Sequence, residues 1–400
     1  MVPASIEIGD RGQGLPRRSI RDAVNWCEFA AQMASCARAL PGGTEVAHDE
    51  LSKCRDAGTL FNLLATLPIL PQGKKYRWRR HMNPPRVSVI IAAYNAEALL
   101  ERAVTSVLTQ TVANTEVIII DDASTDRTAA IAEDLERRDP RVRHLRLATN
   151  SGPGPARAAG LEAAIGEWIA VLDADDVMRP DRLEILLREA DCHSADVVAD
   201  NLALIDPATL IQSDIAFPIG TEDRLIVDAQ TFLRNSVPGG RVNLGWMQPM
   251  MCASWLRRHG ITWREIRHAE DMLLMMELLL SGARVLLLGV PAYHYTTRVS
   301  RSTGGASSYS RTIRDPDEQI KAVRVLLEEK APQLPRMTRT RLHNMETEII
   351  VTNHILDFLA AIREKRFHSA AGHLLHAFSY PAAFSRCLYA RYGRNANTIR

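Results

Sequence analysis

The chain has 400 residues, 46% of them hydrophobic and 24% charged, so it can bury the core of one large or two medium globular domains. Its formal net charge of +2 argues against a nucleic-acid-binding protein held by overall positive charge. The six cysteines include no CxxC pair, which argues against a zinc ribbon or a disulfide framework and favours reduced thiols in a cytosol.

The first part of the chain predicts helices but no function. The opening segment, MVPASIEIGDRGQGLPRRSI, lacks the apolar core of a signal peptide, and Leu60–Leu70 is too short to cross a bilayer. Helical periodicity at Ala23–Leu40 and the basic, proline-containing connector KKYRWRRHMNPPR indicate that residues 1–84 form a helical N-terminal extension. We therefore expect a cytoplasmic protein, at most peripheral at the inner face of the membrane.

Strands and helices alternate through the middle of the chain, from residue 86 to about 305. Val87–Ala92 is a β-branched run typical of a buried strand, and Glu97–Gln110 carries its apolar residues on one helical face. Further strands are predicted at Glu116–Ile120, Val142–Leu147 and Trp168–Leu172. This alternation predicts an α/β fold with a mostly parallel sheet flanked by helices.

The helices between these strands have recognisable start signals. Ser124 or Thr125 is expected to cap the helix that runs through Glu136, and Pro180 to occupy the first position of the helix after the fourth strand. The segment SGPGPARAAG opens the helix that runs to Ile165.

Polar residues follow the predicted strands at Tyr94-Asn95, Asp121-Asp122 and Asp173 to Asp176. In parallel sheets ligands bind at the carboxyl ends of the strands, near a switch in strand order. The sequence therefore predicts that these residues line one rim of the sheet.

The most unusual of these segments is the aspartate cluster in Leu172-Asp-Ala-Asp-Asp176. Three carboxylates in four positions suit a hard divalent cation, whereas the alternative is a solvated turn. Asp121-Asp122 similarly either caps the next helix or accepts a hydrogen bond from a nucleotide base. Whether Asp176 or His294 contacts a metal is left open by the sequence.

Two further segments allow both a functional and a structural interpretation. The glycines of Ser151–Arg157 permit close backbone approach beside a helix N-terminus, which favours an anion, although Arg157 could equally be a surface arginine. Glu270-Asp271 opens the helix through Leu280, where the helix dipole by itself favours acidic residues. After a strand at Val285–Leu288, PAYHYTTRVSRSTGG is expected to be a mobile loop near the site.

The last part of the chain, residues 306–400, is predicted to be a helical C-terminal extension with helices at Gln319–Glu329 and Arg339–Ile362. A helical face there is formed by Phe367, Ala371, Leu374, Leu375 and Phe378, with histidines and arginines nearby. This face either packs against the rest of the protein or lies on an anionic membrane surface.

Together these motifs resemble the family 2 glycosyltransferases with the GT-A fold, over roughly Arg86 to Thr303. The resemblance depends on the order and spacing of VSVIIAAYN, IIIDDASTD, the Ala156-Arg157 pair with Gly160, GEWI, LDADD, PDRL and Glu270-Asp271. The segments DVVADN and NLGWMQP are most similar to bacterial exopolysaccharide transferases of the succinoglycan type. Ala158 departs from the asparagine that the family often has after the Ala-Arg pair.

This resemblance implies a GT-A domain over residues 85–305 and a role for each motif residue. The nucleoside pocket would be lined by Ala92, Ala93, Tyr94, Asn95 and Asp122, with Asp122 on uracil. Arg157 would approach the base or the diphosphate. Asp173 would contact the ribose, and Asp175 would bind the Mn²⁺ or Mg²⁺ that bridges the two phosphates. Asp271 would be the general base of an inverting transfer.

The implied activity is that of a hexosyltransferase in bacterial exopolysaccharide synthesis. The donor would be a UDP-sugar, UDP-glucose in particular, and the acceptor a hydroxyl group of a saccharide or of a lipid-linked oligosaccharide.

Two other classes share part of this pattern. A haloacid-dehalogenase-type phosphatase also has an apolar strand before Asp-x-Asp, but there it is the first strand and a later Gly-Asp pair completes the site; here three predicted strands precede it and no such pair follows. A receiver signalling domain would match the separation of Asp121-Asp122 from Asp173, but it would need Asp121 on the first strand.

Overall fold

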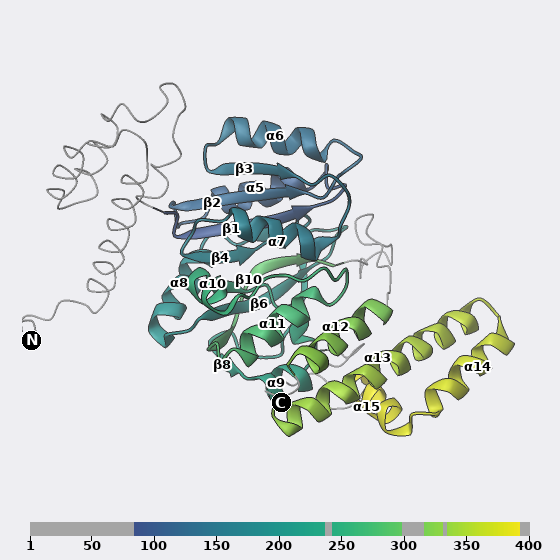
Figure 1. The fold of residues 1–400 in the computed structure, drawn as a ribbon. Coiled ribbons are helices and arrows are strands. Elements are labelled where there is room, and N and C mark those ends of the chain that lie inside the picture. Colours follow the sequence, from purple (N-terminus) through teal and green to yellow (C-terminus); the bar gives the residue numbers. More distant parts are fainter. Residues whose placement is uncertain (1–83, 237–241, 298–315, 331–333, 393–400) are drawn as a thin grey trace, which may run out of the picture. The chain divides into compact units, whose positions relative to one another are not determined.

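The computed structural model describes residues 84–236, 242–297, 316–330 and 334–392 (Figure 1). The helix expected at Ala23–Leu40 lies outside the described residues, as do residues 298–305 of the expected loop. Everything below concerns the described part of the chain.

The first four strands form the parallel half of one sheet and confirm the predicted order of elements. They are β1 (Val87–Ala93), β2 (Thr115–Asp121), β3 (Val142–Arg146) and β4 (Trp168–Val171), arranged β3-β2-β1-β4. Every residue of β2 and β4 is buried, which explains why these strands are continuous apolar runs in the sequence. The order reverses between β1 and β4, so the switch point lies at the ends of these two strands.

The other half of the sheet makes it mixed rather than mostly parallel. The order continues from β4 through β9 (Met250–Cys252), β6 (Val197–Ile205) and β10 (Val285–Thr296) to β5 (Val177–Met178). Here β9 runs antiparallel to both β4 and β6, whereas β10 is parallel to β6. Two short strands, β7 (Gln212–Ile215) and β8 (Arg224–Val227), pair antiparallel with β6 and β10. The short strand β9, which hydropathy alone did not predict, is the strand that runs opposite to its two neighbours and so makes the sheet mixed.

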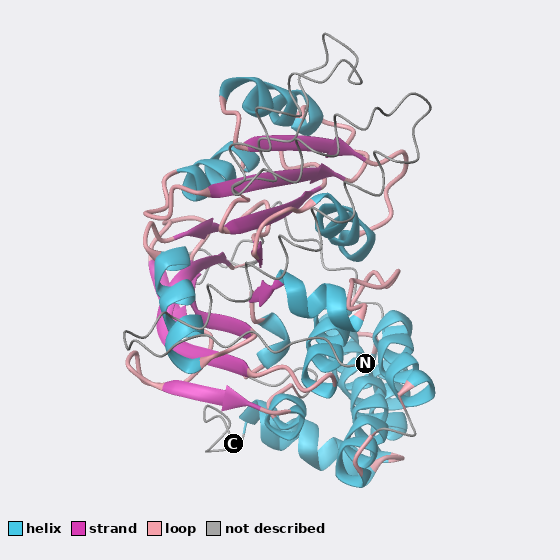
Figure 2. Cartoon of the chain, turned by 60° about the vertical axis from the view of Figure 1, so that its left-hand side comes forward, coloured by secondary structure: helices cyan, strands magenta, loops and turns pink. Residues whose placement is uncertain are grey.

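Helices cover both faces of the sheet (Figure 1 and Figure 2). The connections α5 (Leu100–Leu108) and α6 (Thr128–Arg138) lead outward to β2 and β3, and α7 (Pro153–Ala163) leads back to β4. Because parallel crossovers are right-handed, the change of direction puts α7 on the opposite face from α5 and α6. On the second half of the sheet, α8 (Arg182–His193) packs against β6 and β10.

Two predicted helix starts differ from the structure. Neither Ser124 nor Thr125 caps α6: the helix begins at Thr128, whose backbone N–H donates to the Asp126 carboxylate at 2.9 Å. Pro180 does not occupy the first position of α8, which begins at Arg182. In both cases the chain makes an extra turn after the strand before it becomes helical, and short polar turns leave no periodic signal in the sequence.

The segment expected to be a loop after Leu288 is largely strand. β10 continues through Thr296, because Tyr293 to Thr296 pair with β6 on one side, and Tyr293 and His294 pair with β5 on the other. A register shift at Pro291 accommodates the residue that cannot donate a backbone hydrogen bond. This part of the chain is therefore fixed by two strand neighbours.

Further helices lie between β8 and β10 and after β10. The helices α9 (Ala229–Arg234), α10 (Ala253–His259) and α11 (Glu270–Leu280) are followed by α12 (Pro316–Glu329), α13 (Arg336–Arg363), α14 (Phe367–Phe378) and α15 (Pro381–Tyr392). α12 packs against α11 and α13, and α13 packs against α14 and α15 around a small core that includes Val351, Ala377 and Cys387. Among the described helices, none has both the length and the apolar character needed to cross a membrane.

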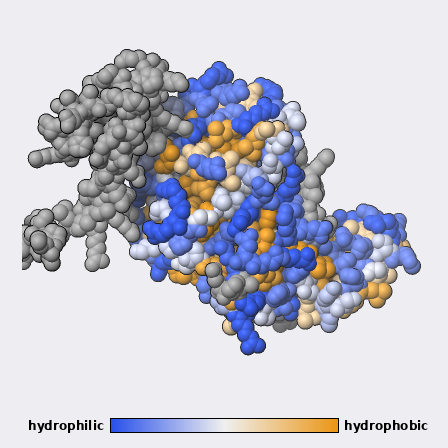
Figure 3. Space-filling view, viewed as in Figure 1, coloured by the Kyte–Doolittle hydropathy of each residue, from blue (hydrophilic) through white to orange (hydrophobic). Residues whose placement is uncertain are grey.

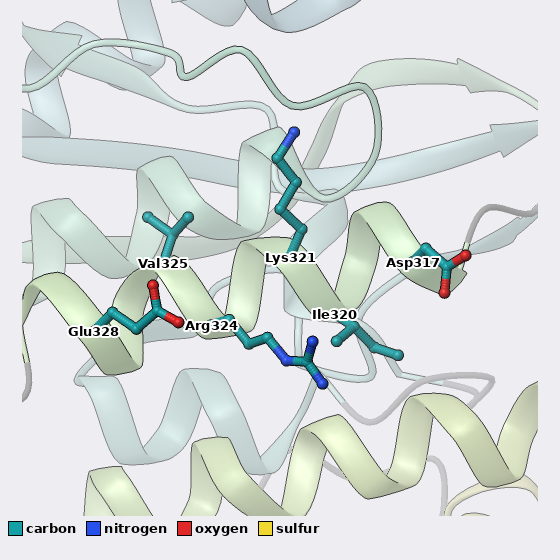
Figure 4. A pocket seen from close by; sticks show the side chains of 6 residues that line it. All are labelled: Asp317, Ile320, Lys321, Arg324, Val325 and Glu328. Atoms are coloured by element: carbon teal, nitrogen blue, oxygen red, sulfur yellow. The ribbon is translucent and has the colours of Figure 1, made fainter.

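A cavity of about 410 Å³ lies along α12 (Figure 4). Its described lining comes from this helix alone, and its cations are paired with carboxylates: Lys321 with Glu318, and Arg324 with Glu346 on α13. None of the motif residues from the sequence lines this cavity.

Candidate active site

The aspartate cluster forms a tight turn between β4 and β5. One carboxylate oxygen from each of Asp173, Asp175 and Asp176 can be chosen so that all three lie within 4.8 Å of one another. Hard carboxylate oxygens at this spacing fit a Mg²⁺ or Mn²⁺ ion, which also accepts substrate phosphates as ligands. The side chains therefore fit the cation that the sequence predicted.

Strand β10 holds this turn in place. The Tyr293 hydroxyl accepts a hydrogen bond from the Asp173 backbone N–H at 3.1 Å and donates to the Asp176 carboxylate at 2.8 Å. The Thr296 backbone N–H donates to Asp176 at 2.7 Å, and its hydroxyl donates to the Asp175 carbonyl at 2.7 Å. Arg102 of α5 donates to the same carbonyl at 2.6 Å. The turn is thus fixed by side chains from two other elements.

Asp176 differs from the other two aspartates because it is buried. Burial, and next the neighbouring charges of Asp175 and Asp173, raise the pKa of Asp176 well above its usual range. Its carboxylate is already engaged by Tyr293 and Thr296. Asp173 and Asp175 are half-buried and so are the more accessible members of the turn.

Arg157 of α7 lies at the centre of the acidic residues. Its Nη2 donates to Asp173 Oδ1 at 2.7 Å, and its Nη1 donates to Glu270 Oε1 at 2.8 Å and to Asp271 Oδ1 at 3.0 Å. The Arg157 side chain is only 5% exposed, so it is not the surface arginine that the sequence allowed. One guanidinium group therefore joins the turn after β4 to the start of α11.

The two acids that open α11 have different surroundings. Burial and then the Asp271 charge raise the pKa of Glu270 to about 8, with Arg157 opposing them. Burial also raises the pKa of Asp271, against the effect of Arg157, even though the helix dipole at this position favours an acidic residue. The Asp271 side chain is 29% exposed and that of Glu270 is 11% exposed. Asp271 is thus the more accessible of the two acids.

Further donors orient the carboxylates around Arg157. The indole N–H of Trp263 donates to Asp271 Oδ1 at 3.2 Å, and the Gln248 side-chain amide donates to Asp173 Oδ2 at 3.2 Å. Gln248 lies just before β9, whose first residue pairs beside the end of β4. The antiparallel direction of β9 therefore brings Gln248 to the rim.

The residues predicted to line a nucleoside pocket gather at the ends of β1 and β2. Ala92 and Ala93 end β1, and the Ala93 carbonyl accepts the Asp122 backbone N–H at 2.9 Å. Asn95 has a positive φ of 50° and accepts a hydrogen bond from the Thr125 backbone N–H at 2.9 Å. Tyr94 between them is 50% exposed. These residues form the rim at the switch point.

Asp122 is buried and connects this rim to the loop before α7. Its two carboxylate oxygens accept the backbone N–H groups of Ser151 and Gly152, each at 2.8 Å. Gly152 has a φ of +91°, which favours glycine, and a Cβ on Gly154 would lie 2.5 Å from the Arg264 carbonyl oxygen. Asp122 thus orders the Gly-Pro loop; the remaining lone pairs of its oxygens can accept another donor.

The structure brings the predicted residues together at one rim and adds residues that the sequence did not indicate. Asp173, Asp175 and Asp271 are grouped with Arg157, and Asp122 with Ala92 to Asn95. His294 lies beside β5, where burial and then the charge of Arg179 lower its pKa, with Asp200 opposing them. Tyr293, Thr296, Arg102, Gln248 and Trp263 were missed. Tyr293 and Thr296 lie in the segment that we expected to be a loop, Arg102 lies in a predicted helix, and Gln248 lies in the segment NLGWMQP. Nothing in the sequence linked these side chains to the acidic residues.

Comparison with known proteins identifies similar sequences. The family profile described as Glycosyl transferase family 2 matches residues 88–225. The succinoglycan biosynthesis protein ExoO of Rhizobium meliloti (strain 1021) is 35% identical over 243 residues, which cover 58% of this chain and 66% of ExoO. ExoU of the same organism is 30% identical over 309 residues, which cover 75% of this chain and 85% of ExoU.

Solved structures support the same fold. S. aureus TarS 1–349, in complex with UDP-GlcNAc, superposes with a TM-score of 0.52 at 20% sequence identity, over 78% of this chain and 84% of that one. The predicted GT-A fold is therefore confirmed, with the mixed sheet described above. The matches give no support to a haloacid-dehalogenase-type phosphatase or a receiver domain.

Proposed function

This chain belongs to glycosyl transferase family 2, and from that premise we propose that it is an inverting transferase that uses a UDP-sugar donor in exopolysaccharide synthesis. One observation supports this most strongly: Arg157 joins the acidic turn after β4 to the acids that open α11. A site for a metal-bound diphosphate and a general base for the acceptor are thereby adjacent. We propose that this catalytic domain spans residues 85–305 and that residues 306–400 extend it.

The donor would lie along the rim at the switch point. Ala92 to Asn95 and Asp122 would line the nucleoside pocket, with Asp122 on uracil and Asp173 on the ribose. The exposed Tyr94 ring and the buried Asp122 carboxylate are suited to stack on and to hydrogen-bond a planar base. Asp175 would hold Mn²⁺ or Mg²⁺. When bound, that ion supplies Lewis-acid stabilisation of the negative charge on the departing UDP.

Asp271 would be the general base. The acceptor hydroxyl gives its proton to the Asp271 carboxylate as its oxygen bonds to the anomeric carbon, and the bond from that carbon to the UDP oxygen breaks. The raised pKa of Asp271 favours this role, because a base titrating nearer to neutral pH accepts a proton more readily. Attack from the side opposite to UDP inverts the anomeric configuration.

Arg157 would act between donor and base in this arrangement. In the structure its guanidinium is shared among three carboxylates. A diphosphate held at Asp175 would compete with these carboxylates for the Arg157 guanidinium. This supports the predicted approach of Arg157 to the diphosphate. We propose that binding of the donor frees Asp271 from part of this ion pairing.

The names of the two relatives suggest the process in which the protein acts. ExoO and ExoU are succinoglycan biosynthesis proteins. We propose a similar role here, with UDP-glucose as the donor and a saccharide or a lipid-linked oligosaccharide as the acceptor.

The test is a screen of nucleotide sugars for hydrolysis by the full chain with and without Mn²⁺. We expect UDP-glucose to be turned over only with the metal and to release UDP. No metal-dependent release of UDP from any UDP-sugar would contradict the proposal, as would preference for a nucleotide other than UDP.

We also propose peripheral membrane contact through α14, which would suit a lipid-linked acceptor. Phe367, Leu375 and Phe378 are 67%, 70% and 51% exposed, so this face does not pack against the described catalytic domain. Instead α14 contacts α13 and α15 through its buried alanines, among them Ala377. Figure 3 shows hydrophobic patches among hydrophilic residues at the lower right, where α14 and α15 lie. Exposed Arg363, Lys365 and Arg366 precede the helix.

Liposome flotation tests this contact. The variant Phe367→Ser/Leu375→Ser/Phe378→Ser should float less than the wild-type chain with anionic vesicles. The matched control, Leu210→Ser/Ile211→Ser, replaces residues that are 62% and 67% exposed elsewhere and should float like wild type. Equal flotation of all three proteins would contradict membrane contact by α14.

A further inference from the structure

A tryptophan at the rim of the site is exposed without an evident structural reason. Trp246, in the short helix η1 (Leu244–Trp246), is 44% exposed, although large aromatic side chains are usually mostly buried. Its ring is parallel to that of Tyr295 within 5°, and the two centroids are 6.4 Å apart. This separation is in the range of offset-stacked aromatic pairs. The pair therefore presents a preformed aromatic surface.

The topology of the sheet places this pair beside the acidic residues. Trp246 is two residues before Gln248, whose side chain donates to Asp173. Tyr295 immediately precedes Thr296, which holds both Asp175 and Asp176. At the rim where β4 ends, β9 begins and β10 ends. This is because β9 runs antiparallel to both β4 and β6, and β10 runs parallel to β6.

The same pair also lies on the side of the helix that carries the proposed base. The helix η1 packs against α11, which begins with Glu270 and Asp271. A ring on the aromatic surface would thus lie beside the residues that hold the acidic turn and on the side of α11, the helix that carries Asp271. These two places bind the two reacting groups in the proposed transfer.

The chemistry of an exposed indole suits a sugar ring. The C–H groups on one face of a hexopyranose form an apolar surface with a slight positive charge, and the face of an aromatic ring is negative. Stacking needs no ionised partner and leaves the hydroxyl groups at the edge of the sugar free to react. An indole fixed against a second ring also loses little side-chain freedom on binding.

We propose that Trp246, supported by Tyr295, is a stacking platform for a hexopyranose ring, which we take to be the ring of the acceptor. This inference rests on the proposed transferase function. It adds a subsite to the donor rim, on the side of α11. The alternative source of such a ring is the sugar of the donor, and the experiment separates the two.

The test is saturation-transfer NMR on the full chain with two sets of probes. Methyl β-D-glucopyranoside and methyl β-D-galactopyranoside report an acceptor-type ring, and UDP-glucose with Mg²⁺ reports the donor ring. We expect ring C–H signals from a methyl glycoside to be lost in Trp246→Leu and kept in Trp246→Phe. Loss of an aromatic stack weakens binding by roughly tenfold. Tyr389→Leu, which removes an aromatic ring that is 48% exposed on α15, should behave like wild type.

The outcomes are distinct. Loss of the glycoside signals in Trp246→Leu supports an acceptor subsite, and loss of only the glucose signals of UDP-glucose supports a platform for the donor sugar. The platform is wrong if Trp246→Leu keeps all signals, or if the wild-type chain gives no sugar-ring signal with any probe. Calorimetry of UDP with Mn²⁺ on the same samples tests the proposed function separately, because Trp246→Leu should leave that binding unchanged.

Discussion

Arg157→Met should destabilise the protein far more than the loss of an ordinary arginine. The side chain is 5% exposed, and its guanidinium donates to Asp173, Glu270 and Asp271 at 2.7 to 3.0 Å. Methionine fills similar space but leaves these carboxylates without their cation. Removing one partner of a buried ion pair costs about 3–5 kcal/mol.

The cost should also depend on pH. Arg157 lowers the pKa of both Glu270 and Asp271 against the effect of burial, so without it their folded-state pKa values rise further. Carboxyl groups with raised pKa values stay protonated in the folded protein over a wider range, and stability is lost as pH rises through those values. The destabilisation by Arg157→Met should therefore be larger at pH 8 than at pH 6.

The measurement is urea unfolding followed by circular dichroism at both pH values. Arg138→Met is the matched control, because Arg138 also pairs with two acids, Glu101 and Asp134, but is 53% exposed. Exposed ion pairs contribute about 0–1 kcal/mol, so the control should stay close to wild type. If Arg157→Met costs no more than Arg138→Met, Arg157 does not hold the acidic residues together.

Three further predictions concern single side chains of the site. Asp271→Asn should leave the affinity for UDP with Mn²⁺ near wild type but lower the transfer rate by about 10²–10⁴-fold, and a rate within tenfold of wild type would place the base elsewhere. Glu270→Gln should damage transfer less. Because the pKa of Glu270 is raised to about 8, wild-type stability should fall as pH rises from about 4.5 to 8, and Glu270→Gln should reduce that fall in thermal unfolding; an unchanged pH profile would contradict the burial of that acid. Tyr293→Phe removes the hydroxyl between Asp173 and Asp176 and should cost about 1–3 kcal/mol and weaken Mn²⁺-dependent binding of UDP, whereas Tyr380→Phe should not. Equal results for the two tyrosine variants would show that β10 does not orient the acidic turn.

The sequence predicted the parallel half of the fold well because each of its strands has a local signal. Buried strands such as β1 and β2 are continuous β-branched runs, and the polar residues that follow them lie at one rim, as expected. The segments LDADD and Glu270-Asp271 were recognisable from their composition and spacing. The amphipathic helix α5 and the long helix α13 were also predicted, with ends that differ by a few residues.

The rest could not be predicted, because it depends on partners that are distant in the chain. β9 has three residues and becomes a strand only between β4 and β6. Tyr293 and Thr296 were assigned to a loop, since the pairing of β10 with β5 and β6 leaves no pattern in a segment that contains Pro291. The burial of Arg157 depends on acids that are 16 and 114 positions away, and a helix with a weak apolar face gave no hint of it.

The central claim is that the acidic turn holds a metal-bound UDP-sugar, and calorimetric titration of UDP tests it most directly. The full chain and its Asp175→Asn variant are titrated with UDP in the presence and in the absence of Mn²⁺. A neutral amide is a poor ligand for a hard cation, so we expect wild type to bind UDP more tightly with Mn²⁺ and the variant to lose that gain while remaining folded. Binding of UDP with Mn²⁺ by Asp175→Asn at wild-type affinity would contradict the claim, as would wild-type binding that does not respond to the metal.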